Sequence, residues 1–226
     1  MKKQIPIVIA TIRPWNIAEY KRWKVPRGYK KVLITKKEDL TAEKLKRLNP
    51  RYVFIPHWSW IIPRDVYEQF ECVVFHMTDL PFGRGGSPLQ NLISRGVYKT
   101  KVTALRVAKG VDTGPIYLKR PLDISKGSAE QLYTKLAEVS FSMMTHIVVR
   151  QPAPHPQKGR ATVFPRRTLE MSRLPEKATA RQLYDHIRML DAPEYPRAFI
   201  EIGVMRIEFS NACLKRGRVT ADADIV

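Results

Sequence analysis

The chain has 226 residues, 44% of them hydrophobic, and carries 40 lysines and arginines against 21 aspartates and glutamates. This composition can build a core and excludes a wholly disordered chain, and no apolar run approaches the roughly 20 residues that cross a bilayer. The formal charge of +19 leaves three explanations open, namely a nucleic-acid partner, small polyanionic ligands or a solvated basic surface.

The first ten residues end in a short apolar run, Ile5 to Ala10, that Thr11, Arg13 and Asn16 bring to an end, and no small-residue cleavage site follows. This pattern favours a first buried strand over a signal peptide, so we expect a cytoplasmic protein without a membrane partner. Cys72 and Cys213 are the only cysteines, and both fall in strand-like segments. We therefore expect two buried thiols in a reducing compartment, and no metal site because neither cysteine has a metal-ligand spacing.

Apolar, β-branched segments alternate with helix-compatible segments through the first third of the chain. The expected strands cover residues 5–10, 31–35, 52–56 and 72–76. The helices between them are expected to end at Trp23, to begin after Thr41 as N-cap, and to start at Pro63. This alternation predicts an α/β fold with a parallel sheet that is covered on both faces.

In such sheets ligands bind beyond the carboxyl ends of the strands, which singles out the loops after 52–56 and 72–76. In the first loop, Trp58 and Trp60 are compatible with a cover for the sheet end and equally with a wall for a flat heterocycle. The second strand ends in His76, and a glycine-rich, arginine-bearing loop follows it. A titratable side chain beside a flexible loop indicates a site.

The second half of the chain divides into three parts. Strands at 103–107 and 116–120 are expected to flank a turn between Gly110 and Gly114, and an amphipathic helix is expected over 128–149. A proline-rich stretch then marks a boundary. A helix at 179–190 and short strands at 198–202, 205–211 and 219–225 follow. We therefore predict a catalytic domain at 1–150, a linker at 151–178 and a small mixed subdomain at 179–226.

Several of these motifs together resemble the folate-dependent formyltransferases, a family that includes sugar-modifying and tRNA-modifying branches. The resemblance runs through His76, Leu80-Pro81, Arg84-Gly85, Pro88, Gln90, Val102-Thr103 and Asp112-Thr113-Gly114. Residues 157–159 and 164–168 resemble the joint of the sugar-modifying branch, and 181–192 and 195–199 resemble the start of the family's C-terminal region. The resemblance implies a Rossmann-like fold and 10-formyltetrahydrofolate as the formyl donor.

The resemblance also implies a catalytic pair. His76 would polarise the formyl carbonyl or shuttle protons, and Asp112 would orient it or balance its charge. The family has asparagine two residues before the histidine, whereas this chain has Val74, which cannot donate a hydrogen bond. Either the pair acts alone or another group takes that role. The candidates are Asn91, which we include among the catalytic residues, and Gln90, Thr78 and His57.

Two further groups of residues are expected to contact ligands by this resemblance. The candidates for binding the folate are Trp58, Trp60, Ile61, Ile62, Val107, Gly110 and Val111. The candidates for binding the acceptor are Arg84, Gly85, Gly86, Ser87 and Gln90. Arg84 is equally compatible with orienting the loop backbone and with meeting an anion.

Three functions are compatible with these features. The first is a sugar N-formyltransferase that acts on a nucleotide-linked amino sugar, such as a nonulosonic-acid precursor, with folate and no nucleic acid as partner. Because sugar formyltransferases are often homodimers, the C-terminal subdomain is a candidate assembly surface. The second is a methionyl-tRNA formyltransferase-like enzyme, which would use the basic charge but has a larger C-terminal domain than the segment found here. The third is a binding protein that has lost the asparagine and the activity.

Overall fold

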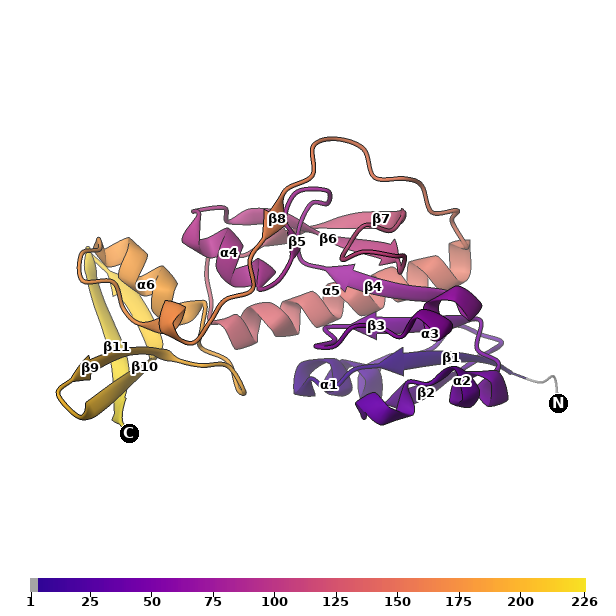
Figure 1. The fold of residues 1–226 in the computed structure, drawn as a ribbon, viewed down its shortest axis with the longest axis horizontal. Coiled ribbons are helices and arrows are strands. Elements are labelled where there is room, and N and C mark those ends of the chain that lie inside the picture. Colours follow the sequence, from indigo (N-terminus) through magenta and orange to yellow (C-terminus); the bar gives the residue numbers. More distant parts are fainter. Residues whose placement is uncertain (1–3) are drawn as a thin grey trace. The chain divides into compact units, whose positions relative to one another are not determined.

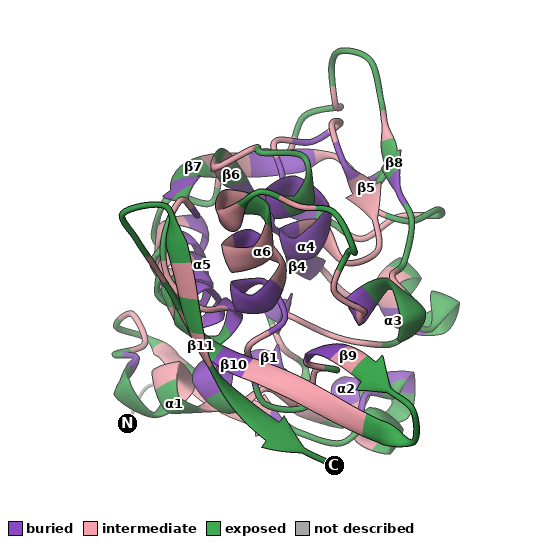
Figure 2. Cartoon of the chain, turned by 90° about the vertical axis from the view of Figure 1, so that its left-hand side faces the viewer, coloured by how far each residue is buried: buried purple, intermediate pink, exposed green. Residues whose placement is uncertain are grey.

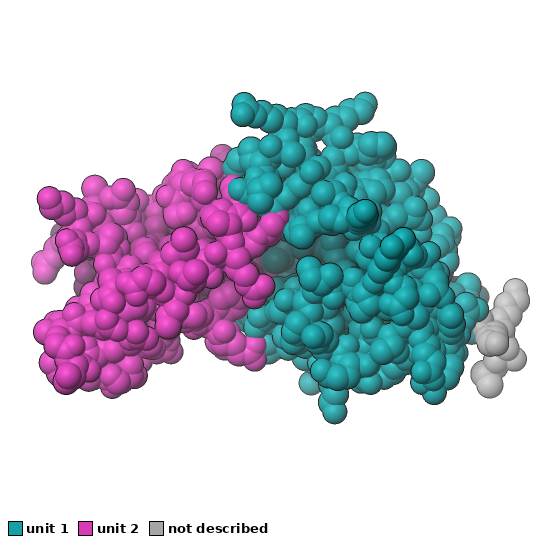
Figure 3. Space-filling view, in the orientation of Figure 1, with its two compact units in different colours: residues 1–84, 101–122, 134–163 teal, residues 85–100, 123–133, 164–226 magenta. Residues whose placement is uncertain are grey.

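The computed structural model describes residues 4–226 (Figure 1), so the first three residues, which precede the N-terminal apolar run, lie outside it. These residues form two compact units (Figure 3). Unit 1 comprises residues up to 84 together with 101–122 and 134–163, and unit 2 comprises 85–100, 123–133 and 164–226. The units combine distant stretches of chain, and the segment boundaries at 150 and 178 stay predictions.

The main sheet confirms the α/β fold with a mostly parallel sheet. Its six strands lie in the order β2-β1-β3-β4-β6-β7, and they are β1 (Ile5–Ala10), β2 (Tyr29–Ile34), β3 (Tyr52–Pro56), β4 (Cys72–His76), β6 (Lys99–Arg106) and β7 (Ile116–Asp123). β2, β1, β3 and β4 are parallel, whereas β6 runs antiparallel to β4. The helices between the strands are α1 (Pro14–Arg22), the 3-10 turn η1 (Lys37–Asp39), α2 (Ala42–Leu48), α3 (Arg64–Gln69), α4 (Pro88–Ser94) and α5 (Ala129–Arg150).

Both faces of this sheet are covered because successive strand side chains point to opposite sides. On one side, Val53 and Cys72 belong to a buried cluster with Leu45 of α2 and Val66 of α3. α1 and α5 contact each other through Trp23, whose ring meets Phe141 edge-on with centroids 5.6 Å apart. The carboxyl ends of β3 and β4 are left as the edge where ligands bind in such sheets.

Unit 2 contains a small three-stranded antiparallel sheet in the order β11-β10-β9. Its elements are η2 (Glu170–Ser172), α6 (Ala180–Arg188), β9 (Ala198–Ile202), β10 (Met205–Lys215) and β11 (Arg218–Ile225). α6 lies within the helix predicted at 179–190, and Thr179 and Gln182 form a reciprocal capping box at its start. β11 is largely exposed (Figure 2). A further pair, β5 (Arg84–Gly85) and β8 (Val163–Phe164), forms a two-stranded sheet.

The expectation that both cysteines are buried is right for Cys72 and wrong for Cys213, which is exposed. The pairing of β10 with β11 shifts register between Ser210 and Cys213, where Asn211 has a φ of 52°. Along this part of β10, buried or half-buried residues at positions 210, 212 and 214 alternate with exposed residues at 211, 213 and 215, and Cys213 falls on the exposed side. Alternation read from the sequence alone does not show which of the two sides is covered. Within residues 4–226, no helix is both long and apolar enough to cross a membrane.

Candidate active site

His76 ends β4 and is 8% exposed. Its Nε2 lies 2.7 Å from the carbonyl oxygen of Gly83, which also accepts a hydrogen bond from the Thr78 hydroxyl at 3.3 Å. Because a carbonyl can only accept, this contact places a hydrogen on Nε2. Nδ1 is then the nitrogen that gains or loses the second proton. It lies 3.4 Å from a carboxylate oxygen of Asp112.

Asp112 lies in the turn between β6 and β7 and has a φ of 52°, a left-handed conformation that is uncommon for residues other than glycine but is tolerated by aspartate. The Thr113 hydroxyl donates to the Lys109 carbonyl at 2.8 Å within the same turn. Gly114 closes it against the chain, because a Cβ there would lie 1.8 Å from the carbonyl oxygen of Arg106. The Asp-Thr-Gly motif therefore serves two purposes, because Thr113 and Gly114 allow the turn to form and Asp112 supplies the carboxylate.

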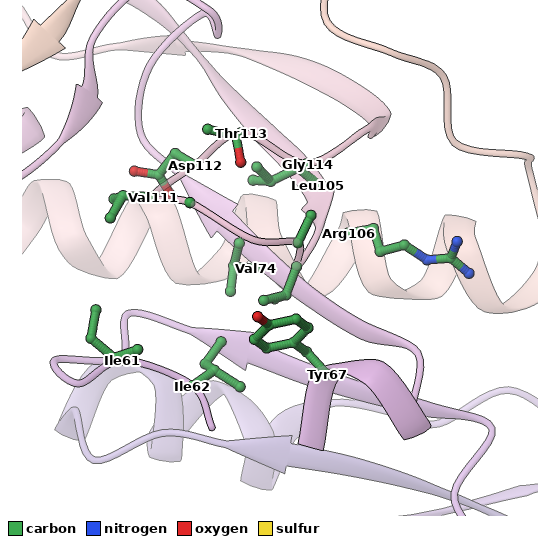
Figure 4. A pocket seen from close by; sticks show the side chains of 13 residues that line it. Ile61, Ile62, Tyr67, Val74, Leu105, Arg106, Val111, Asp112, Thr113 and Gly114 are labelled. Carbon is green, nitrogen blue, oxygen red and sulfur yellow. The ribbon is translucent and has the colours of Figure 1, made fainter. Parts of the chain in front are cut away.

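A pocket of about 280 Å³ lies beside this turn (Figure 4). Figure 4 shows Ile62 and Tyr67 on one side of it and residues 112–114 on the other. Its complete lining is Ile61, Ile62, Tyr67, Val74, Leu105, Arg106, Val107, Ala108, Gly110, Val111, Asp112, Thr113 and Gly114. The lining residues are mostly apolar, and two of them, Gly110 and Gly114, have no side chain, so a flat heterocycle could approach the backbone there.

Five of the seven residues predicted to bind folate line this pocket, namely Ile61, Ile62, Val107, Gly110 and Val111. Trp58 lines a second cavity of about 260 Å³, which shares Ile61 with the first. Trp60 meets Trp58 edge-on and is 38% exposed. The structure thus brings most of these candidates together, and their contacts with folate stay a prediction.

Val74 lies on the wall of the same pocket. It occupies the position where the resembled family has asparagine, and its half-buried side chain offers neither a donor nor an acceptor. Val74, Tyr67, Leu105 and Ala108 line the pocket although they are not among the residues predicted to bind a ligand. An apolar residue in a strand or loop is usually core, so the sequence carries no separate signal for these positions.

The side chains of Asn91 and Gln90 are occupied within unit 2. Asn91 Nδ2 donates to the carbonyls of Gly86, Ser87 and Pro165 at 3.1, 3.0 and 2.9 Å. Gln90 Nε2 donates to the Tyr133 hydroxyl and to the Met189 carbonyl at 3.0 and 2.9 Å. An amide nitrogen has two hydrogens, so neither residue retains one for a ligand. Both side chains hold the loop and helix in place, which gives no support to their predicted ligand roles.

The part of the glycine-rich loop from Gly85 onward belongs to unit 2 and packs within that unit. A Cβ at Gly86 would lie 2.7 Å from the Cα of Arg166, so glycine is needed for close packing of two backbone segments. Ser87 has a φ of 47°, and its hydroxyl accepts a hydrogen bond from the Arg167 backbone at 3.1 Å. Gly85, Gly86 and Ser87 thus have structural roles, and their contacts with an acceptor stay predictions.

His57, another candidate donor, follows β3. The indole Nε1 of Trp15 lies 3.3 Å from its Nδ1, which must therefore accept. Burial, with a smaller contribution from the Arg13 guanidinium, lowers the pKa of His57 to about 3. Its ring is thus neutral at physiological pH and does not serve as a cation there.

Arg106 lines the pocket, but its guanidinium pairs with Glu71, which also accepts a hydrogen bond from the Tyr117 hydroxyl. Burial alone would raise the pKa of Glu71, but the hydrogen bonds from Arg106 and Tyr117 outweigh burial and hold the pKa below its usual value. The network fixes β6 and β7 next to β4 and neutralises the cation nearest the pocket. Among residues 4–226 no group of three or more histidine, cysteine, aspartate or glutamate side chains could hold a metal ion.

Comparisons with known proteins identify the family. The sequence model described as formyl transferase matches residues 14–148, and that of the methionyl-tRNA formyltransferase C-terminal domain matches residues 169–226. The methionyl-tRNA formyltransferase of Thermodesulfovibrio yellowstonii is 29% identical over 159 residues, which cover 67% of this chain and 52% of that protein. The one of Halorhodospira halophila is 29% identical over 186 residues, covering 77% and 59%. The chain thus spans about half the length of the curated relatives it matches.

Solved structures agree with this assignment. A methionyl-tRNA formyltransferase from Clostridium thermocellum has a TM-score of 0.95 and 48% identity, with 98% of this chain and 99% of that chain covered. HypX from Aquifex aeolicus in complex with tetrahydrofolic acid has a TM-score of 0.74 and 18% identity, covering 93% and 38%. A sugar N-formyltransferase from a Shewanella species has a TM-score of 0.70 and 11% identity, covering 92% and 97%. The last two share the fold alone, but the family match covers more than half of the chain, which therefore belongs to the formyl transferase family.

Proposed function

We propose that the chain transfers a formyl group from 10-formyltetrahydrofolate to a primary amine. The observation that carries this proposal is the His76–Asp112 pair next to an apolar pocket, in a chain of the formyl transferase family. Ile61, Ile62, Val107 and Val111 line the pocket and would provide walls for a pterin ring, and backbone groups of the 107–112 loop would bind its polar edge. HypX, which has this fold, binds tetrahydrofolic acid.

The pair supplies what the reaction requires. The amine attacks the formyl carbon, the bond from that carbon to the folate nitrogen breaks, and the proton lost by the amine ends on that nitrogen. His76 Nδ1 is the group that carries the proton between these two sites, and the Asp112 carboxylate 3.4 Å away balances the charge it acquires. Val74 contributes no donor to the developing oxyanion, so we propose that the positive charge of protonated His76 stabilises the oxyanion electrostatically.

For the acceptor we favour the amine of methionyl-tRNA over an amino sugar. Residues 169–226 match the C-terminal domain of methionyl-tRNA formyltransferases, and a protein of that name from Clostridium thermocellum has the same extent as this chain. The short C-terminal segment therefore does not argue against the tRNA alternative. A formal charge of +19 also suits a polyanionic acceptor. The sugar N-formyltransferase interpretation is supported only by the shared fold. The experiment below therefore tests amino sugars as well as methionyl-tRNA.

The test supplies 10-formyltetrahydrofolate together with either methionyl-tRNA or a panel of nucleotide-linked amino sugars. Mass spectrometry then detects a formyl group on the amine. We expect formyl-methionyl-tRNA, and we expect His76→Asn and Asp112→Asn to lower kcat by about two orders of magnitude. The exposed His155 provides the control His155→Asn, which should retain full activity. Formylation of sugars alone would refute the acceptor, and unchanged kcat in both site variants would refute the catalytic pair.

A further inference from the structure

Gln157 makes four hydrogen bonds with one side-chain amide. Its Nε2 donates to the carbonyls of Asp112 and Gly114 at 2.8 and 2.9 Å. Its Oε1 accepts from Arg84, at 3.2 Å from Nε and 2.7 Å from Nη2. Both amide hydrogens and both oxygen lone pairs are used, which is the full capacity of this group. Gln157 is half-buried, while its neighbours from residue 158 to residue 161 are exposed.

These bonds fix the part of the turn that is least stable by itself. Asp112 has a φ of 52°, a conformation that costs most non-glycine residues about 1 kcal/mol and aspartate less than most. The direction of its carboxylate toward His76 depends on that backbone conformation. Gln157 binds the carbonyl of Asp112 and the carbonyl two residues later, so it holds the turn on both sides of Thr113.

Through Arg84, Gln157 is also connected to the loop that carries Gly83, the second hydrogen-bonding partner of His76. Arg84 follows Gly83, whose carbonyl lies 2.7 Å from His76 Nε2. The backbone of Arg84 donates to the Thr162 carbonyl at 2.9 Å, and the Gly83 backbone donates to the Thr162 hydroxyl at 2.8 Å. Residues 157–162 therefore contact the chain next to both hydrogen-bonding partners of His76.

We propose that Gln157 is a positioning residue for the formyl-transfer centre. It holds Asp112 next to His76 Nδ1, and the hydrogen bonds from Arg84 fix Gln157 itself in place. The inference rests on the function proposed above and adds a residue to it. Arg84 thereby has a defined role in orienting loop backbone, one of the two roles that its sequence position left open. Only an amide fits the position, because a carboxylate could accept from Arg84 but could not donate to two carbonyls.

The test is Gln157→Glu, which has nearly the same shape and removes both donors. We expect kcat to fall roughly 10- to 100-fold with the KM for the amine acceptor unchanged, since a displacement of about 1 Å at a reacting group has effects of this size. The matched control is Gln151→Glu, the same chemical change at an exposed glutamine of the same segment. It should leave kcat unchanged. Were Gln157→Glu unable to fold, Gln157→Asn would keep the amide while shortening its reach.

A double-mutant cycle separates positioning from general damage. If Gln157 acts through Asp112, then Gln157→Glu should cost much less in the Asp112→Asn background than alone. Additive losses would overturn the proposal.

Nitrogen-15 NMR of the His76 imidazole without substrates tests the geometry independently of catalysis. We expect Gln157→Glu, but not Gln151→Glu, to change the Nδ1 signal. An unchanged signal would overturn the positioning role even if the enzyme proved to act on another substrate. If Gln157→Glu changes the Nδ1 signal but the wild-type protein transfers no formyl group, the positioning role would stand and the proposed function would be overturned.

Discussion

Val74 is the residue at which this site departs most from the resembled family. Its side chain lines the pocket, so a polar group placed there would face the ligand and would not be sealed in the core. Valine and asparagine are similar in size, and a well-placed oxyanion donor typically contributes about 10²- to 10³-fold to kcat.

We therefore expect Val74→Asn to raise kcat, by about tenfold if the amide reaches the formyl oxygen only part of the time. Val74→Leu serves as the control, since it changes the pocket wall without adding a donor. The measurement is the initial rate of formyl transfer at saturating donor. A folded Val74→Asn protein with unchanged or lower kcat would show that the native site is already supplied with a donor.

His57 links the site region to the pH dependence of stability. Its folded pKa of about 3 lies below the value of about 6.5 expected in the unfolded chain. Between these values the unfolded state binds the extra proton and the folded state does not. The free energy of unfolding should therefore fall as the pH falls below about 6.5, by at most about 1.4 kcal/mol per pH unit.

We expect His57→Asn, which retains an acceptor for Trp15 and tolerates the φ of 51°, to lose this dependence. Urea unfolding at about pH 7 and about pH 5 measures the difference, since one pH unit of uncompensated proton binding is worth about 1.4 kcal/mol. His155→Asn, at an exposed position, serves as the control and should keep the pH dependence of the wild type. Equal losses of stability in the wild type and in His57→Asn would show that other groups dominate.

At the scale of elements, periodicity predicted the strands well and the connections less well. Residues 52–56, 72–76 and 198–202 form strands with the predicted bounds, because β-branched and aromatic runs between turn residues allow few alternatives. The Thr41 cap is confirmed by its bond to the Lys44 backbone at 3.2 Å. The bulge in β10 and the antiparallel direction of β6 depend on partners distant in sequence, so local patterns do not contain them.

In the candidate site, too, some features could be predicted from the sequence and others depend on residues distant in the chain. His76 and Asp112 could be paired from the sequence only because the family motif fixes their spacing, and the structure places their side chains 3.4 Å apart. The left-handed backbone of Asp112 and the clamp by Gln157 could not be predicted. The clamp consists of hydrogen bonds between residues 43 to 45 positions apart, which local sequence patterns do not contain. The occupied amides of Asn91 and Gln90 are likewise a tertiary effect.

The turn between β6 and β7 provides a test at this scale. Gly114→Ala places a Cβ where only 1.8 Å separates it from the Arg106 carbonyl oxygen, so the backbone must move. We expect a loss of roughly 1–3 kcal/mol in stability, as is typical of overpacking, and a lower kcat because Asp112 moves with the turn. Thermal unfolding and initial rates measure the two effects. Lys109→Ala, at an exposed position of the same turn, is the control, and equal behaviour of the two variants would contradict the steric argument.

At the scale of the whole molecule, the positive charge is unevenly distributed. Unit 1 contains 26 lysines and arginines against 10 aspartates and glutamates, whereas unit 2 contains 14 against 11. Many arginines of unit 2 have acidic partners, such as Arg197 with Asp224 and Arg206 with Glu201. In unit 1, by contrast, no acidic residue occurs between residues 20 and 37, a stretch that includes exposed Lys24, Arg27 and Lys30. The unbalanced charge of the chain therefore belongs mainly to unit 1.

If methionyl-tRNA is the acceptor, its phosphates should bind this unbalanced charge. Each phosphate contact contributes about 0.7–0.9 to the slope of log K against log salt concentration. We expect the triple variant Lys24→Gln, Arg27→Gln, Lys30→Gln to weaken tRNA binding and to reduce the slope by about two to three. The matched control, Lys215→Gln, Arg216→Gln, Arg218→Gln, removes the same formal charge from the exposed β10–β11 turn of unit 2. Fluorescence titrations at several salt concentrations measure both. An equal effect of the two variants would assign the affinity to net charge alone, and a larger effect of the control would assign the contact to unit 2.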